Sequence, residues 1–540
     1  MQSTVTATEL HARLSGSQEI ALLDVREASD FVRAHLNLAR HLPLSQLELL
    51  AAKVLPRRGT PIVVCDDDGG ESGFAERAAA LLARLGYADV ALLAGGVAAW
   101  QAQGLPTSAG YGTFVRAFAD QARVHFGIDT ITPTQLHARL ASGRSTTVID
   151  VRPTPEFHHA SIPGACNHQG MELARMDFSA PDPDHLWVIN CFSRTRGVLG
   201  TSTLKILGGL QNVAFLEDGV MSWFVHGFDT AHGATPAPPL AEQDPDALRA
   251  QADRIIAAHG LSVITPEQLD AFRRDGARTL YVFDVRLPTG QAGPAGHDGS
   301  DIQCVPGGQL LMHYDTHVGT RHARLVLVDD AALLRAAVCA FWLSQLADGE
   351  VHILRGQPTP FPAAVQWPTE DDGRGMAAEE LRTHLDAGQA TVVDVAPSVE
   401  FEKRHIPGAH YMLRSALPQL PVLAQLRAPV VFVSSDGRAA QLAARDMEEL
   451  LGIPARWLRG GTEAWARAGQ PVAAAWTESQ QLTPFWDDWG SVMRLRPEQR
   501  AEVYPRYLEW ERGVAARAAV DATVQFRFRA LQSEKSDTRA

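Results

Sequence analysis

The sequence predicts an α/β protein of four tandem units, each a parallel sheet with helices on both faces, followed by a helical C-terminal tail. Short apolar runs alternate with segments of helical periodicity, which is typical of parallel strands buried between helices. One such run, ending in Asp-Val, occurs four times along the 540 residues, at Asp24, Asp150, Asp284 and Asp394. The interval between copies is a domain length and not the shorter period of a solenoid.

Each unit is expected to contain the same elements in the same order. The first is a helix that starts after Thr or Ala, over TATELHARL, TPTQLHARL, TPEQLDAFRR and AAEELRTHL. The Asp-Val strand follows, and then a second buried strand, a loop and a second helix, in PIVVCDDD, LWVINCFSRTRG, LVLVDD and PVVFVSSDGR. A Gly-containing turn before a tryptophan closes three units, at Trp100, Trp223 and Trp465, whereas the third unit has only ILRGQ.

These repeats define the expected domain boundaries. The four units are predicted over residues 1–110, 125–232, 250–365 and 372–475, and the tail over 476–540. The Pro- and Ala-rich segment Ala231–Asp244 is expected to be a linker after the second unit. Aromatic and charged residues are mixed in the tail, which predicts amphipathic helices that either pack on a neighbouring unit or form a partner or dimer surface.

Composition and charge exclude several classes of protein. Hydrophobic residues make up 45% and charged residues 21%, as in an ordinary globular protein. The net charge of −13, with no basic patch, argues against nucleic-acid binding. The longest apolar stretch, Ala331–Ala347, is too short to span a bilayer and is interrupted by Arg335. The five cysteines form no CxxC or Cys/His pattern, so we expect a cytoplasmic protein without disulfides, metal or cofactor.

The repeated motifs resemble those of the rhodanese family. That family has a strand ending in D-V-R, an E-F-x-x-x-H-I-P-G-A stretch, a strand leading to a Cys loop, and a closing G-G-x-x-x-W. The fourth unit carries EFEKRHIPGA at Glu400–Ala409, and the second carries EFHHASIPGA at Glu156–Ala165, with Ser161 in place of His. The first unit has DFVRAHLNLA at Asp30–Ala39, without the Pro-Gly. The chain is similar to bacterial proteins with four tandem rhodanese domains, which implies that fold.

The resemblance also implies a nucleophile. In the family, a cysteine thiolate at the end of the central strand accepts a sulfane sulfur, and the loop after it surrounds that sulfur with backbone N–H groups. Only the second unit has the full loop, which consists of Cys191, Phe192, Ser193, Arg194, Thr195 and Arg196, with Gly197 opening the next helix. These residues are the predicted catalytic and substrate-binding set.

Each residue type in this loop has a physical role. A helix N-terminus and nearby cations lower the pKa of a cysteine, so Cys191 is expected to be the thiolate nucleophile. Arg194 and Arg196 supply positive charge for an anionic donor, while Ser193 and Thr195 can donate hydrogen bonds or cap the helix. Two further residues, Asp150 and Arg152, are expected in a buried network beneath the loop, either supporting the site or stabilising the fold.

The other units lack the nucleophile. Counting back from the end of the following helix places Ser434, Asp330 and Asp66 at the position of Cys191. A hydroxyl cannot hold a persulfide and a carboxylate repels an anionic donor, so these units are predicted to be inactive. Cys65, one residue before Asp66, is interpreted as a strand residue. The weaker alternatives are that Cys65 is a second nucleophile and that Cys166 is a resolving thiol. Cys304 and Cys339 are interpreted as structural.

Three functions are compatible with this sequence. The first is a sulfurtransferase that moves a sulfane sulfur from thiosulfate or a similar anion to cyanide or a thiol through a Cys191 persulfide. The second, a phosphatase or arsenate reductase, needs an Arg where Gly197 stands. The third is a non-catalytic scaffold or binding protein. The expected partners are a small anionic donor and a thiol or cyanide acceptor, with a protein sulfur acceptor and a homodimer left open.

Overall fold

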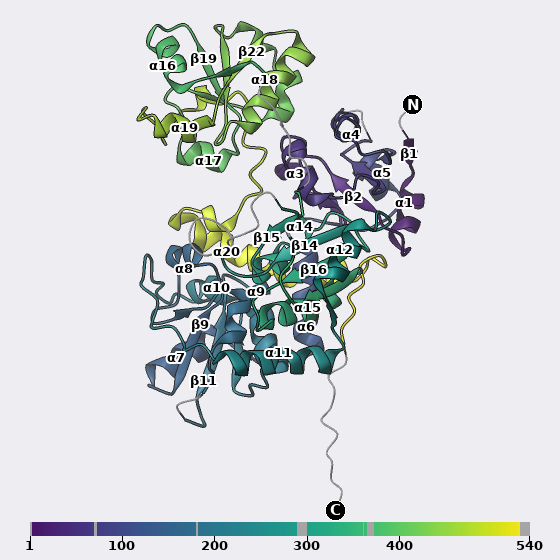
Figure 1. Cartoon of the computed structure of the whole chain (residues 1–540). Coiled ribbons are helices and arrows are strands. Elements are labelled where there is room, and N and C mark those ends of the chain that lie inside the picture. Colours follow the sequence, from purple (N-terminus) through teal and green to yellow (C-terminus); the bar gives the residue numbers. More distant parts are fainter. Residues whose placement is uncertain are drawn as a thin grey trace, which may run out of the picture.

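A computed structural model describes residues 3–69, 73–179, 182–288, 300–359, 361–363 and 372–529 of the chain (Figure 1). These residues form four five-stranded sheets and one small antiparallel pair. Every strand pair within the five-stranded sheets is parallel, and helices flank them, so the predicted fold class is confirmed.

The first unit consists of the strands β1 (Ser3–Val5), β2 (Ala21–Asp24), β4 (Arg40–His41), β5 (Ile62–Cys65) and β6 (Val90–Leu93), and the helices α1 (Ala7–Leu14), α2 (Ala28–Phe31), α3 (Leu47–Val54), α4 (Phe74–Arg84) and α5 (Gly96–Ala102). The strand order is β1-β6-β5-β2-β4. The short strands β3 (His35–Leu36) and β7 (Thr107–Ser108) pair antiparallel beside this sheet.

The second unit consists of the strands β8 (Thr130–Ile131), β9 (Thr146–Asp150), β10 (Cys166–Asn167), β11 (Leu186–Asn190) and β12 (Val213–Leu216), and the helices α7 (Pro133–Ala141), α8 (Thr154–His159), α9 (Thr195–Ile206) and α10 (Gly219–Val225). Its strand order, β8-β12-β11-β9-β10, matches that of the first unit. The strand before the Cys191 loop, β11, is therefore the central one.

The third and fourth units repeat this order. The third contains β13 (Ser262–Ile264), β14 (Leu280–Asp284), β15 (Ile302–Cys304), β16 (Arg324–Val328), β17 (Glu350–Leu354), α12 (Pro266–Arg274), α13 (Gly307–Met312), α14 (Tyr314–His317) and α15 (Leu334–Leu346). The fourth contains β18 (Gly375–Met376), β19 (Thr391–Asp394), β20 (His410–Tyr411), β21 (Val430–Val433), β22 (Ala455–Leu458), α16 (Ala378–Asp386), α17 (Ser398–Lys403), α18 (Arg438–Leu451) and α19 (Gly461–Arg467).

The first helix of each unit begins where the sequence predicts. Thr6, Thr132 and Thr265 each cap a helix by accepting the N–H of the residue three positions on, and a Glu or Gln there bonds back to the threonine N–H. Such a reciprocal cap satisfies two backbone donors that the helix itself leaves unpaired. The fourth unit has Ala377 at this position, without a side-chain cap.

Four α-helices of the described residues lie outside the repeats, and three of them are α6 (Thr113–His125), α11 (Pro245–His259) and, in the tail, α20 (Pro497–Arg512). The short helix α21 (Val514–Ala518) follows α20 and packs on α6. In Figure 1, α20 lies beside α8 and α10 of the second unit. Tail residues 530–540 lie outside the described residues.

One hydrophobic core joins the first three units. It contains buried side chains of all three, together with those of α6 and α11. Phe118 of α6 is fully buried within it, and the Trp342 indole of the third unit donates a 2.8 Å hydrogen bond to Thr203 Oγ1 of the second. The fourth unit has separate cores and contacts the first unit through side chains such as Arg414, which pairs with Glu48 (Figure 1).

Candidate active site

Cys191 is the first residue after the central strand of the second unit. β11 ends at Asn190, and α9 begins four residues after the cysteine, at Thr195. The Cys191 sulfur accepts the backbone N–H of Gly197, in the first turn of α9. A side chain at position 197 would place its Cβ 2.8 Å from the Phe215 ring, so glycine is needed there. The strand and the helix together fix the thiol at the positive end of a helix.

The glycine of the closing motif also shapes this loop. Gly219 has a φ of +60°, and a Cβ on it would clash with the carbonyl oxygen of Cys191. Gly96 and Gly461 have the same conformation against the corresponding loops of the first and fourth units. The repeated Gly-x-x-x-Trp motif therefore lets the backbone of one turn pack directly on the loop.

Burial dominates the electrostatics of Cys191. The side chain is 2% exposed, and burial raises the pKa of the thiol above its ordinary value. The Arg196 guanidinium and the Gly197 N–H oppose this rise, whereas Asp150 and Glu511 add to it. The cation and the backbone N–H of the helix lower the pKa of Cys191 as expected, but burial raises it by more.

The two loop arginines are already paired with carboxylates. Arg196 donates two hydrogen bonds to Glu156, of 2.8 and 2.6 Å. Arg194 bonds Asp218 at 2.6 Å and also bonds Asp120 of α6. The positive charge expected of both arginines is therefore offset by carboxylates, because buried guanidinium groups need counter-ions and the fold supplies them.

Asp150 and Arg152 form a buried pair beneath the loop. Both side chains are fully buried and are joined by hydrogen bonds of 2.6 to 3.1 Å. Arg152 also donates to the Ala160 carbonyl, and its guanidinium lies 5.7 Å from the centre of the Phe192 ring. The pair thus ties the end of β9 to the motif that follows and supports the loop through Phe192.

The tail covers the loop, which the sequence did not show. Phe192 packs edge-on against Tyr504 of α20, in a cluster that includes Met221 and Leu508. The other contact is polar, since Ser193 Oγ donates to Glu511 at 3.1 Å. Of the two interpretations of the tail, packing on a neighbouring unit describes what these residues do.

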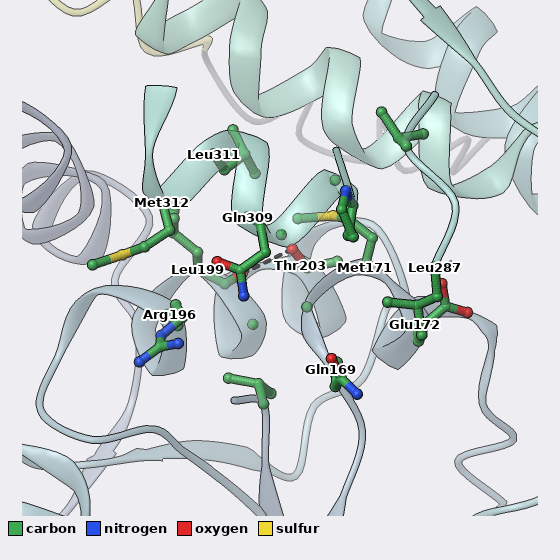
Figure 2. Close-up of a pocket in the computed structure, with 17 residues that line it drawn as sticks. Gln169, Met171, Glu172, Arg196, Leu199, Thr203, Leu287, Gln309, Leu311 and Met312 are labelled. Carbon is green, nitrogen blue, oxygen red and sulfur yellow. Dashed lines mark hydrogen bonds between the residues drawn. The ribbon is translucent and has the colours of Figure 1, made fainter. Parts of the chain in front are cut away.

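A pocket lies between the second and third units, next to the loop (Figure 2). Its walls are mostly apolar, with Met171, Leu199 and Leu311 among the lining residues, and Gln169 and Gln309 supply amides. Arg196 lines one end, so the pocket reaches the Cys191 loop (Figure 2).

The third unit also places a histidine near this end of the pocket. His313 follows Met312, which lines the pocket, and its electrostatic neighbours include Arg196 and Glu156. Burial, with Arg196 next in effect, lowers the pKa of His313 to about 4, so the imidazole is neutral at physiological pH. No sequence motif singled out this residue.

The equivalent positions in the other units hold Asp66, Asp329 and Ser434. Their side chains accept the N–H of Ala75, Ala336 and Ala440, at 3.0, 3.0 and 3.2 Å, in the first turn of the following helix. An oxygen therefore takes the hydrogen bond that the Cys191 sulfur takes in the second unit.

The assignment of Asp330 to this position is wrong by one residue. In the second unit the last residue of the central strand, Asn190, pairs with Asp150. In the third unit Val328 pairs with Asp284 in the same way, so the first loop residue is Asp329. The count from the helix end failed because the loop and the helix after it are each one residue longer in the third unit, over residues 329–346, than in the second, over residues 191–206.

The other four cysteines are not part of the loop, although Cys166 belongs to the same hydrophobic cluster as Cys191. Cys65 is the last residue of β5, and Cys166 in β10 has its sulfur 3.6 Å from the Val148 carbonyl oxygen. Burial raises the pKa of both thiols, that of Cys166 to about 11. All five cysteines are free, and within the described ranges no cluster of His, Cys, Asp and Glu could hold a metal ion.

Comparison with known proteins identifies the repeats. The model of the Rhodanese-like domain family matches residues 6–103, 132–226 and 377–468. These three regions make up more than half of the chain. The chain belongs to the rhodanese family. The third unit has the same strand order but lies outside the matched regions.

Two relatives of this rhodanese are described by name. A crystal structure of a thiosulfate sulfurtransferase from Pseudomonas aeruginosa is 32% identical, with 98% of this chain and 100% of that chain covered and a TM-score of 0.88. Thiosulfate sulfurtransferase GlpE of Vibrio cholerae is 28% identical over 96 residues, which cover 17% of this chain and 86% of GlpE. Among the residues placed by the structure, no helix is long and apolar enough to cross a membrane.

Proposed function

We propose that this protein is a sulfurtransferase that takes a sulfane sulfur from thiosulfate or a similar anionic donor and passes it to cyanide or a thiol. The observation that carries the proposal is the place of Cys191, after the central strand, under the N-terminus of α9 and beside Arg196. Similarity over 98% of the chain to a structure described as a thiosulfate sulfurtransferase supports it.

The reaction would proceed in two displacements. The Cys191 thiolate attacks the outer sulfur of thiosulfate, the S–S bond of the donor breaks, and sulfite leaves with the electron pair. The new Cys191 persulfide carries one negative charge, which the Gly197 N–H and the Arg196 guanidinium stabilise. An acceptor thiolate or cyanide then attacks the outer sulfur and releases the Cys191 thiolate.

The pocket beside Arg196 suits the acceptor. Its apolar walls and two amides fit a small organic thiol better than a free inorganic ion. The other three units, with a carboxylate or hydroxyl in place of the thiol, carry no sulfur in this proposal. The first and third of them share a hydrophobic core with the second unit.

Intact-protein mass spectrometry tests the proposal. After incubation with thiosulfate without reductant and removal of the donor, the wild type should gain one sulfur, about 32 Da. Cys191→Ser should gain nothing, while Cys166→Ser, which removes a buried thiol of the same unit, should gain as the wild type does. No adduct on the wild type, or the same adduct on Cys191→Ser, contradicts the proposal. Hydrolysis of phosphate esters without an adduct would favour the phosphatase alternative.

A further inference from the structure

A tail carboxylate is buried against the active-site loop. Glu511, in the last turn of α20, is 3% exposed. Its Oε1 accepts hydrogen bonds from Ser193 Oγ, at 3.1 Å, and from the guanidinium of Arg116 in α6. Its Oε2 is buried and has no hydrogen-bond partner among the described residues. A buried carboxylate oxygen without a hydrogen-bond donor is unfavourable, so the surroundings of Glu511 satisfy only one of its two oxygens.

The arginines near Cys191 differ in the origin of their counter-ions. Arg152, Arg194 and Arg196 pair with carboxylates of the second unit and of α6, namely Asp150, Asp120, Asp218 and Glu156. Arg116 takes its carboxylate from the tail, and its guanidinium also lies 5.9 Å from the centre of the Tyr507 ring. Withdrawal of Glu511 would therefore leave one buried guanidinium without a counter-ion, on the same side of the loop as the Ser193 hydroxyl.

We propose that Arg116 and Ser193 form the oxyanion subsite of the sulfur donor, and that Glu511 occupies it until the donor's sulfonate group displaces the carboxylate. This inference rests on the proposed function. A guanidinium and a hydroxyl are the donors that a sulfonate requires, and a sulfonate has three oxygens where a carboxylate has two. Only a donor that binds Arg116 and Ser193 has to displace the Glu511 carboxylate. Glu511 therefore discriminates among donors by their charge and by their affinity for this subsite.

Two alkylating reagents of the same size test this selection at Cys191. Iodoacetate is an anion and iodoacetamide is neutral, and both react with the same thiolate. The ratio of their rates therefore cancels any change in the pKa of Cys191. The rates are measured on the Cys191 peptide by mass spectrometry, in the full-length protein at one pH and ionic strength.

Glu511→Gln should raise the iodoacetate-to-iodoacetamide ratio about tenfold, because a buried negative charge facing the anion is removed. Arg116→Gln should lower the ratio, because the subsite loses its cation. The matched control is Glu509→Gln, an exposed carboxylate of the same helix turn, which should leave the ratio unchanged. Glu511→Asp, which shortens the side chain, should give an intermediate ratio and provides a second variant if Glu511→Gln unfolds.

An unchanged ratio in folded Glu511→Gln and Glu511→Asp would overturn the inference, as would an equal rise in Glu509→Gln. The same variants separate this failure from that of the proposed function. If the subsite is wrong, the wild type still acquires sulfur from thiosulfate while the ratio stays constant. If the function is wrong, no variant acquires sulfur although the ratio responds to Glu511. When both hold, Glu511→Gln should also lower the KM for thiosulfate.

Discussion

The reactivity of Cys191 depends on a balance between burial and a single neighbouring cation. Burial raises the pKa of the thiol, and Arg196 is the largest opposing influence. We therefore expect Arg196→Gln to raise that pKa further and to slow iodoacetamide alkylation near pH 7.5 about tenfold. The pH dependence of alkylation measures this.

The control for that experiment is the other loop arginine. Arg194 is held by Asp218 and Asp120 and is not among the groups that shift the Cys191 pKa. Arg194→Gln should leave the midpoint of the alkylation profile close to that of the wild type. An equal shift in both variants would show that general disorder of the loop, and not the Arg196 charge, sets the pKa.

Asp394 shows what happens when the Asp-Val-Arg motif loses its arginine. Ala396 stands at the arginine position, and Asp394 Oδ2 is buried without a hydrogen-bond partner in the described part of the chain. Burial raises the pKa of this carboxyl from 3.8 to about 7. The folded form thus holds a proton that the unfolded form releases, so the stability of the fourth unit should fall as pH rises from about 4 to about 7.

Asp394→Asn should remove this dependence. The variant should gain stability relative to the wild type at pH 8 and show little difference at pH 4, as measured by denaturant unfolding of the fourth unit. Asp150→Asn provides the contrast, because it leaves Arg152 without its carboxylate and should destabilise the second unit at both values of pH. A constant effect of Asp394→Asn across this range would contradict the assignment.

At the scale of the element, the decisive contact is between α20 and the Cys191 loop. Tyr504 and Leu508 are the buried residues of this helix that pack on Phe192. Leu508→Ala should weaken that contact by about 2–4 kcal/mol, because it leaves a cavity in the cluster. The expected result is faster hydrogen exchange in α20 and faster iodoacetamide alkylation of Cys191. Arg506→Ala, at an exposed position of the same helix, should change neither rate.

Much of the fold could be predicted from the repeats, because each copy of a motif marks the same strand, loop and helix and the copies support one another. The loop from Cys191 to Gly197 could be located for the same reason. Arg116, His313 and Glu511 could not, because each lies outside the second unit, in a segment that reaches the loop only after the units have packed. Nor could the pairing of Arg194, since Asp120 precedes it by 74 positions.

For the whole molecule, the distribution of cores sets the order of unfolding. One core joins the first three units, whereas the fourth has its own cores and meets the first through ion pairs such as Glu48 with Arg414. We expect two transitions in denaturant. Phe118→Ala should shift the transition of the first three units by about 3–5 kcal/mol, and Phe432→Ala should shift only that of the fourth. A single transition that both variants shift equally would contradict this.

The shared core also bears on how such a chain can change by mutation and recombination. Replacing a catalytic cysteine by Asp66 or Asp329 leaves the helix hydrogen bond in place and the core intact. Deleting the first or third repeat would expose the apolar faces of its neighbours. Selection for the fold of the second unit is therefore sufficient to retain the first and third copies. The fourth copy, attached through ion pairs, is the one that a lineage could lose most easily.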